Sequence, residues 1–528
     1  MKHTTRFFPS VYCCIATCII AWQAAGIVHA QEIRTPAAPD TPRVNGPSVF
    51  GVRPGSPFLY KIPATGAGTI QYSVDGLPEG LDVDSSTGMI TGSVATAGEY
   101  TVTLRATSTL GSNTKSFRIK VGDTIALTPS MGWNSWNCYG VTVTNEKVQA
   151  NAQAMVSSGL IHHGWSYVNV DVGWEAPRGG PYNALQGNAL FPDMQAYCDD
   201  IHALGLKAGL YSTPWTQTYW GYPGGSSYHE DGSFEYVPGL QAIGLYCFET
   251  NDAQQWAEWG VDYMKYDWKP IELPETVRME EALQQCGRDI VYSLSNTTPF
   301  SEIETLSQHC NLWRNNDYCD ITDSWESICD NGFGKDQWAP YQSPGHYNDP
   351  DILCVGRVGW GETQHSTNLT PDEQYTHITL WSLLGAPLLL GCDLTQLDDF
   401  TLNLLTNDEV IAVDQDPLCL QGVCVNEDGD AKVYLKQLED GSIAVGLFNT
   451  GLTPLTVTAD WADLGLLETQ MVRDLWRQND LGEFDGSFQF LVDPHSAELF
   501  RMSASAPEPG TFVLLTIGAA MLGRGRRR

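Results

Sequence analysis

The chain has 528 residues, of which 42% are hydrophobic and 17% are charged. It is therefore globular rather than disordered, and too long for one ordinary domain. The formal net charge of −33 at pH 7 argues against nucleic acid or an anionic membrane surface as the main partner, whereas an uncharged ligand tolerates such a field.

The first thirty residues have the layout of a secretory signal peptide. Lys2 and Arg6 give a basic start, an apolar stretch covers 11–20, and Val28-His29-Ala30 precedes the expected cleavage point. The apolar stretch is too short for a membrane-spanning helix. We therefore expect residues 1–30 to be removed during export.

Residues 45–122 alternate between apolar and polar positions, with turn residues at short intervals. Strands are expected at 70–74, 89–92 and 100–104. This pattern is typical of a β-sandwich. The stretch 76–92 resembles the immunoglobulin-like modules of bacterial surface enzymes, which space or dock a catalytic domain. No acidic pair in it is placed for catalysis.

From 127 to 417, expected strands and helices alternate. Apolar strand candidates lie at 167–170, 207–211, 261–266 and 290–294, and helix candidates lie at 145–157 and 252–259. Nearly 300 residues of this alternation predict an α/β fold of the (β/α)8 TIM barrel type. A doubly wound sheet is the alternative, but no G-x-G-x-x-G motif follows the first strand.

The alternating pattern returns after the barrel, with strands expected at 431–435 and 442–448. We therefore predict a C-terminal antiparallel β-sandwich domain over 418–503.

The C-terminus has a distinct layout of its own. Pro507-Glu508-Pro509 is followed by an apolar run over 511–523 and then by a basic end at 524–528. This order resembles the PEP-CTERM sorting signal of Gram-negative bacteria, whose tail is removed at or near the surface. The resemblance implies that 507–528 is a sorting tail, and that the protein is periplasmic, on the outer surface or extracellular.

Three of the 14 cysteines lie in the expected signal peptide, so eleven remain and at least one thiol is unpaired within the chain. Cys419 and Cys424 are the suggestive pair for a disulfide in an exported protein. No cysteine or histidine cluster has the spacing of metal ligands, so we expect no metal and no cofactor.

Polar residues follow several of the expected barrel strands, where catalytic groups of such barrels lie. Any one of them is more often structural, but six strand ends converging on one rim are an improbable accident. They are the 131–136 stretch, Asp171, Tyr211, Lys265 with Asp267, Asn296, and the stretch from Arg314 to Asp320.

Six stretches in this region are similar to glycoside hydrolase family 27, the family of α-galactosidases and α-N-acetylgalactosaminidases, and they occur in the family's order between about 127 and 420. They are Thr128-Pro129-Ser130-Met131-Gly132-Trp133-Asn134-Ser135-Trp136, Asp262-Tyr263-Met264-Lys265-Tyr266-Asp267, Asp320-Ile321-Thr322-Asp323-Ser324-Trp325, Asn348-Asp349-Pro350-Asp351, Ala386-Pro387-Leu388 and Asp414-Gln415-Asp416-Pro417-Leu418.

The resemblance implies roles for two carboxyl groups. The family's nucleophile is the Asp two residues after a Lys at the end of the fourth strand, here Asp267 after Lys265. Its acid/base opens the D-I-x-D-x-W stretch, here Asp320, with Asp317 and Asp323 as rivals. Lys265 is expected to hold Asp267 ionised. A retaining glycosidase needs such a pair about 5–5.5 Å apart.

The resemblance also implies a set of sugar-binding residues. Trp133 is expected to form an apolar wall, and Asp171 to take a distal hydroxyl. Tyr211, Lys265, Asn296, Arg314 and Asp351 are expected to complete the sugar site.

Several positions depart from the family pattern. The paired acids after the second strand become Asp171-Val172, and Asn296 stands where many members have Glu. Five residues separate Arg314 from Asp320, a longer interval than usual, which puts the register of Arg314 in doubt. Trp268 and Lys269 follow the nucleophile where familiar members have a bridging cysteine.

These residues predict a retaining exo-glycoside hydrolase that releases terminal α-linked galactose from oligo- or polysaccharides, with a carbohydrate as its partner, no nucleic-acid partner and a surface or exopolysaccharide association through the tail. One alternative is a β-L-arabinopyranosidase, because that sugar lacks the 6-hydroxymethyl group that Val172 could not bind. Another is a catalytically inactive carbohydrate-binding surface protein, against which the presence of both acids weighs.

Overall fold

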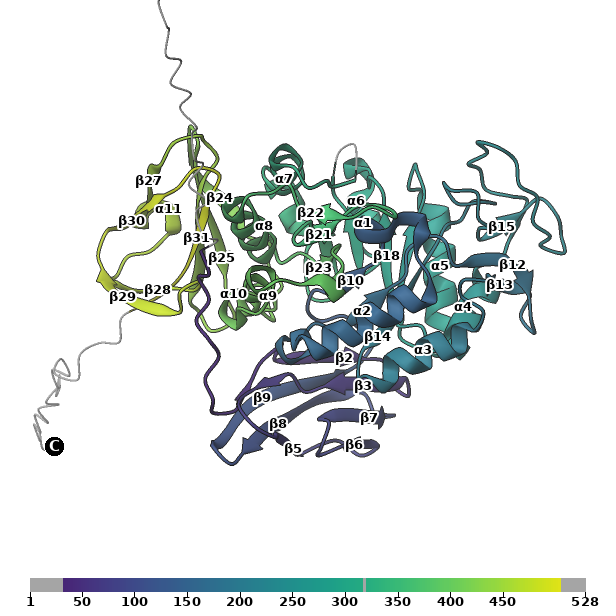
Figure 1. Cartoon of the computed structure of the whole chain (residues 1–528), viewed down its shortest axis with the longest axis horizontal. Coiled ribbons are helices and arrows are strands. Elements are labelled where there is room, and N and C mark those ends of the chain that lie inside the picture. The colour runs from purple at the N-terminus through teal and green to yellow at the C-terminus, as the bar shows by residue number, and fades with distance from the viewer. Residues whose placement is uncertain (1–31, 317–319, 505–528) are drawn as a thin grey trace, which may run out of the picture. The chain divides into compact units, whose positions relative to one another are not determined.

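The computed structural model describes residues 32–316 and 320–504 (Figure 1). The expected signal peptide, the expected sorting tail and Asp317 lie outside these residues. Within the described ranges, no helix is both long and apolar enough to cross a membrane.

Eight parallel strands form the central sheet, in the order β20-β19-β18-β17-β14-β11-β10-β23. The two end strands are joined by a bridge between Leu353, which follows β20, and Leu390, which closes the sheet into a barrel. The strands are β10 (Met131–Asn134), β11 (Tyr167–Asn169), β14 (Lys207–Ser212), β17 (Tyr263–Asp267), β18 (Val291–Ser295), β19 (Leu312–Arg314), β20 (Tyr347–Asp349) and β23 (Leu388–Leu390).

Helices connect these strands on the outside of the barrel (Figure 1). The helix α8 begins with a capping box in which Thr370 and Glu373 satisfy each other's backbone N–H groups, and it ends at the left-handed Gly385. The helices are α1 (Trp136–Tyr139), α2 (Asn145–Ser157), α3 (Met194–Ala203), α4 (Glu249–Trp259), α5 (Leu273–Gln285), α6 (Ile303–Leu306), α7 (Trp325–Gly332), α8 (Pro371–Leu384), α9 (Asp399–Leu405) and α10 (Asp408–Asp414).

The register of the strands decides which side chains meet at the barrel rim. Parallel partners such as Tyr211 and Lys265 lie opposite each other and face the same side of the sheet. Asp267, the last residue of β17, is in register with Ser295 at the end of β18. The polar residues at the carboxyl ends of these strands therefore converge at one rim.

The N-terminal module is a two-sheet β-sandwich with a core of its own. One sheet has the order β2-β9-β8-β5 and the other β3-β7-β6, and β1 pairs with β4. The strands are β1 (Arg43–Val44), β2 (Val49–Val52), β3 (Pro57–Lys61), β4 (Ala64–Thr65), β5 (Gln71–Asp75), β6 (Leu81–Val83), β7 (Met89–Ser93), β8 (Gly98–Ser108) and β9 (Gly111–Val121).

Charged and apolar contacts connect this module to the barrel. Arg53 forms an ion pair with Asp289, with Nε and Oδ1 2.9 Å apart, and its backbone N–H donates to the same carboxylate. Lys207, at the start of β14, lies over the ring of Phe50 at 4.3 Å. The partly buried Lys207 therefore meets an aromatic face that the module supplies, and the module makes specific contacts with the barrel.

The C-terminal domain consists of a six-stranded antiparallel sheet and the pair β27-β30. The segment before the N-terminal module contacts this domain through Arg34, which donates a hydrogen bond to the carbonyl of Ala497 in β31. The same guanidinium also pairs with Asp372 at the start of α8. Its elements are β24 (Val423–Asp428), β25 (Ala431–Gln437), β26 (Ile443–Asn449), β27 (Leu455–Asp460), α11 (Trp461–Leu464), β28 (Gln470–Asp474), β29 (Asn479–Phe484), β30 (Ser487–Val492) and β31 (Ala497–Ala504).

The predicted fold class is confirmed in its three parts: a barrel of parallel strands, an immunoglobulin-like sandwich before it and an antiparallel domain after it. The suggested disulfide is wrong, because Cys419 and Cys424 are both free thiols. The Cys419 side chain is buried, and its Sγ lies 3.1 Å from the carbonyl of Leu127.

Candidate active site

Asp267 lies at the end of β17 and is almost buried, with 8% of its surface exposed. Its Oδ1 accepts a hydrogen bond from the side-chain amide of Asn296. Asn296 follows β18 in the left-handed conformation (φ 73°), which an asparagine tolerates better than most residues. The end of β18 therefore holds an amide donor against this carboxylate.

Lys265 stands two residues before Asp267 and faces the same side of the strand. Its Nζ lies 2.8 Å from Oδ2 of Asp171, which also accepts from Asn134 at 3.1 Å. The direct partner of Lys265 is therefore Asp171. Lys265 acts on Asp267 only as a neighbouring positive charge.

A second carboxyl group, that of Asp320, comes to this rim from the segment after β19. One of its oxygens lies 3.1 Å from Nη2 of Arg314, the last residue of β19. The same guanidinium nitrogen lies 2.5 Å from Asp351, whose carboxylate also accepts the backbone N–H of Ile321. Despite the long interval in sequence, Arg314 does reach Asp320, and Asp351 holds the adjoining backbone.

The two carboxyl groups have opposite tendencies to ionise. Burial, with the neighbouring charges of Asp171 and Asp320, raises the pKa of Asp267 to about 6, although Lys265 and Asn296 oppose this shift. Asp320 keeps an exposed side chain, and the surrounding protein only partly removes its water, which disfavours the charged form; the attraction of Arg314 and Lys265 is greater in sum and lowers its pKa. Lys265 therefore favours the ionised form of Asp267, as expected, but burial and the nearby acids outweigh it and the pKa of Asp267 rises.

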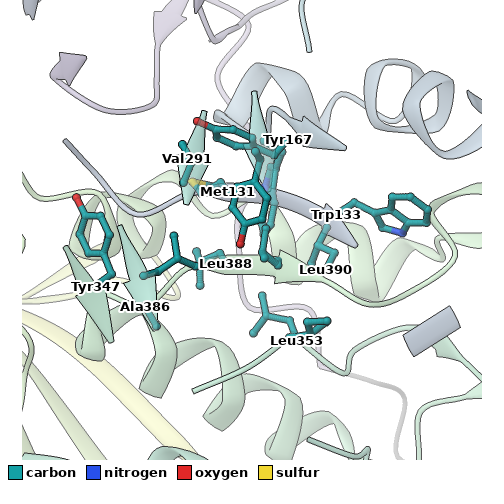
Figure 2. Close-up of a cluster of buried hydrophobic side chains, with 14 of the residues drawn as sticks. Met131, Trp133, Tyr167, Val291, Tyr347, Leu353, Ala386, Leu388 and Leu390 are labelled. Atoms are coloured by element: carbon teal, nitrogen blue, oxygen red, sulfur yellow. The ribbon is translucent and has the colours of Figure 1, made fainter. Parts of the chain in front are cut away.

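Trp133 is not at the rim. It has no exposed surface, and its indole N–H donates to the carbonyl of Cys392 at 2.7 Å. Trp133 packs beside Leu390 in the apolar cluster of Figure 2. The neighbouring Asn134 reaches Asp171 instead, because successive strand residues face opposite sides. The prediction that Trp133 forms a wall of the sugar site is corrected.

Tyr211 is buried on β14, close enough to Asp267 and Asp171 for both charges to raise its pKa further after burial. No hydrogen bond of good geometry joins its hydroxyl to another described residue, but the hydroxyl is near enough to the Asp267 carboxylate to interact with it. A buried hydroxyl so weakly satisfied can also bond a polar molecule bound beside Asp267.

Val172 follows β11 at the position where the family pattern led us to expect a second acid, and Glu175 lies three residues further on. Val172 is buried and offers no polar side-chain atom. One oxygen of Glu175 accepts the backbone N–H of Gly173 at 2.8 Å, while Oε1 is buried without a partner in the described chain. Burial raises the pKa of Glu175 to about 8, so its carboxyl is protonated at neutral pH. The indole N–H of Trp174 donates to the carbonyl of Tyr211, so it has no hydrogen left to donate to a sugar.

Sequence reasoning missed two aromatic residues near these groups. Tyr219 accepts a hydrogen bond of 3.2 Å from the Asn296 amide that also bonds Asp267. Trp136, in the same motif as Trp133, is only partly buried. The alternation of side chains along β10 could have shown that Trp133 faces the core. No periodic pattern marks Tyr219, because it lies in a long loop.

Comparison with known proteins matches the chain to three families. Residues 128–416 match alpha galactosidase A, 428–502 match the alpha galactosidase C-terminal beta sandwich domain, and 41–122 match an Ig domain. Alpha-galactosidase 2 of Arabidopsis thaliana is 35% identical over 396 residues, which are 73% of this chain and 92% of that protein.

Two solved structures are similar in fold and sequence. A candidate alpha-galactosidase of Bacteroides fragilis is 30% identical with a TM-score of 0.80, covering 90% of this chain and all of that one. A β-L-arabinopyranosidase of Geobacillus stearothermophilus is also 30% identical, with a TM-score of 0.63, covering 72% of this chain and 98% of that one.

The barrel, with carboxyl groups gathered at its carboxyl-terminal rim, and these relatives define a glycoside hydrolase. Within that class, the chain belongs to the alpha galactosidase A family, glycoside hydrolase family 27.

Proposed function

We propose that this enzyme removes terminal α-linked galactose by double displacement, with Asp267 as nucleophile and Asp320 as acid/base. The observation that carries the proposal is the pair itself: two carboxyl groups at one rim, held by Asn296 and Arg314, with the charge of Asp320 acting on Asp267. Retaining glycosidases divide their work between two such groups.

In the first step, a carboxylate oxygen of Asp267 bonds to the anomeric carbon while the glycosidic bond breaks. Asp320 donates its proton to the departing oxygen. In the second step, Asp320 takes a proton from water, and the resulting hydroxide displaces Asp267 from the sugar. No metal or redox group is needed to balance either step.

Other groups of the site are suited to hold the sugar. The ion pair of Asp171 and Lys265 offers both an acceptor and donors, and the Tyr211 hydroxyl beside Asp267 adds another group. Because Arg314 and Asp351 bond each other, we assign them chiefly to holding Asp320 in place. We assign to Trp136 the role expected of Trp133, that of an apolar wall beside the bound galactose.

A panel of nitrophenyl glycosides tests the proposal. The α-galactoside should be cleaved fastest, with the α-anomer of galactose as the first product seen by NMR. Release of the β-anomer would contradict double displacement, and binding without any hydrolysis would favour the inactive carbohydrate-binding alternative.

The nearest competing function is that of a β-L-arabinopyranosidase. Val172 cannot hydrogen-bond the 6-hydroxyl of galactose, and an unsatisfied buried hydroxyl costs about 1–3 kcal/mol, equivalent to roughly 5- to 150-fold in discrimination. We expect Val172→Asp to raise kcat/KM for α-galactosides relative to β-L-arabinopyranosides by a factor in this range. The measurement is kcat/KM for both substrates on both enzymes.

Glu175→Gln is the companion variant, because Glu175 has an oxygen without a partner close to this position. If Glu175 already binds the 6-hydroxyl, Val172→Asp leaves the ratio unchanged and Glu175→Gln lowers it. An unchanged ratio in both variants would mean that neither residue reaches the 6-position.

The paired titration predicts an acidic pH optimum. The working form carries one proton on the pair, and that proton must be on Asp320 while Asp267 is ionised. Because the pKa of Asp267 is raised and that of Asp320 is lowered, this working form is the minority arrangement of the singly protonated pair in the free enzyme. Because the pair loses its last proton near the pKa of Asp267, about 6, kcat/KM should fall about tenfold per pH unit above that value. A kcat/KM profile from pH 3 to 9 measures this limb.

Asp320→Ala provides the control for this profile. Without Asp320, an activated aryl galactoside requires only ionised Asp267, so the remaining activity should rise with pH and then level off. A wild-type profile that stays flat up to pH 8 would rule out the paired titration.

We also infer that the protein is exported and then sorted at the cell surface. The support is the layout of residues 1–30 and 507–528 in the sequence. N-terminal sequencing of the mature protein, with its mass, tests both processing steps.

A further inference from the structure

The chain between β14 and α4 carries an unusual share of exposed aromatic surface. Of the six exposed Trp, Tyr and Phe side chains in the described chain, five lie between residues 219 and 246. They are Tyr219, Trp220, Tyr228, Tyr236 and Tyr246. Because this segment follows the carboxyl end of a barrel strand, it begins at the rim that carries the catalytic groups.

Tyr219 links this segment to the catalytic pair. Its hydroxyl accepts a hydrogen bond from Asn296, which also bonds Asp267. Its ring is packed edge-on against Trp215, with the ring centroids 4.8 Å apart. Burial, followed by the charges of Asp267 and Asp320, raises the pKa of the Tyr219 hydroxyl, which agrees with a position near both carboxyl groups.

Trp220 extends the aromatic surface outward from Tyr219. It is 57% exposed, although indole is among the costliest side chains to leave in water. Its neighbour is Trp136 of α1, at a centroid distance of 5.7 Å and an angle of 52°. These two residues come from segments following β14 and β10, so two separate loops bring tryptophans together at the rim.

We propose that Tyr219 and Trp220, here called the aromatic rim and supported from behind by Trp136, bind the sugar unit of the leaving group. Among the oligo- and polysaccharides already expected as substrates, the preferred ones are then those in which terminal galactose is attached to another pyranose that packs on these rings. This inference rests on the proposed function, because it assigns the leaving-group side of that same site.

The chemistry of the leaving group supports this assignment. The departing oxygen must lie beside Asp320, and the sugar attached to it must extend from the barrel past whatever lines the opening. The C–H face of a pyranose is apolar and packs on a flat aromatic ring, while its hydroxyls remain in water. A neutral sugar also suits a chain whose net charge is −33.

The test compares Trp220→Ala with wild type on two substrates. One is α-galactosyl fluoride, whose leaving group has no sugar, and the other is a disaccharide with α-(1→6)-linked terminal galactose. We expect kcat/KM for the disaccharide to fall about tenfold, and that for the fluoride to change less than about twofold. Trp220→Phe, which keeps an aromatic face, should recover most of the loss.

Tyr228→Ala is the matched control, because Tyr228 lies in the same segment and is similarly exposed, but lines a separate hollow with His229 and Phe234. It should change neither rate. Equal losses on both substrates in Trp220→Ala, or no loss on either, would overturn the aromatic rim alone. Failure of wild type to cleave either substrate would instead overturn the proposed function on which the aromatic rim depends.

Discussion

Asp267→Asn is expected to lower kcat/KM for an aryl α-galactoside by roughly a thousandfold or more. An amide cannot form the glycosyl ester on which double displacement depends. The fold should survive, because asparagine has nearly the same shape as aspartate and can still meet the Asn296 amide after a side-chain rotation. Initial rates, together with thermal unfolding of both proteins, measure the two effects separately.

A covalent label provides an independent check on Asp267. A 2-deoxy-2-fluoro-galactosyl fluoride should trap the ester on the wild-type enzyme, and mass spectrometry should locate the added mass at Asp267. Activity above a few per cent in Asp267→Asn, or a label on another carboxyl group, would show that the nucleophile is elsewhere.

Asp320→Ala should have an effect that depends on the leaving group. Removing the proton donor slows departure of a sugar alcohol by about 10²–10⁴-fold, whereas a dinitrophenolate departs with little assistance. The Asp320 side chain is 56% exposed, so the loss should not come from unfolding. A plot of log kcat/KM against leaving-group pKa should be much steeper for the variant than for wild type.

Asp323→Asn is the matched control for Asp320→Ala. Asp323 is a rival in sequence, but its carboxylate accepts the backbone N–H of Asn368 at 2.8 Å, away from Arg314. Its substitution should leave the slope of the plot unchanged. If the steep slope appeared in Asp323→Asn instead, the assignment of the acid/base would have to move.

The sequence predicted the barrel well because its strands are short apolar segments separated by helical ones. The expected helix at 145–157 coincides with α2, and the expected strand at 207–211 falls within β14. Asp267 and Asp320 could be put forward as candidates because short local motifs contain them. Both signals come from residues close together in the chain, which is where sequence patterns carry information.

Two features of the site could not be predicted from the sequence, because they depend on contacts between segments far apart in the chain. Trp133 and Trp136 are equally prominent in the motif, and only the facing of β10 separates the buried one from the partly exposed one. The raised pKa of Asp267 is a sum of burial and several opposed charges, so the single neighbour Lys265 was a poor guide to it.

The contacts made by the N-terminal module have a consequence for dissecting the enzyme. A fragment cut at the start of the barrel would leave Asp289 without Arg53 and uncover the ammonium of Lys207, which now lies under Phe50. It would also lose Arg34, which joins α8 to the C-terminal sheet. A fragment that keeps these contacts must therefore include Arg34 and the whole immunoglobulin-like module.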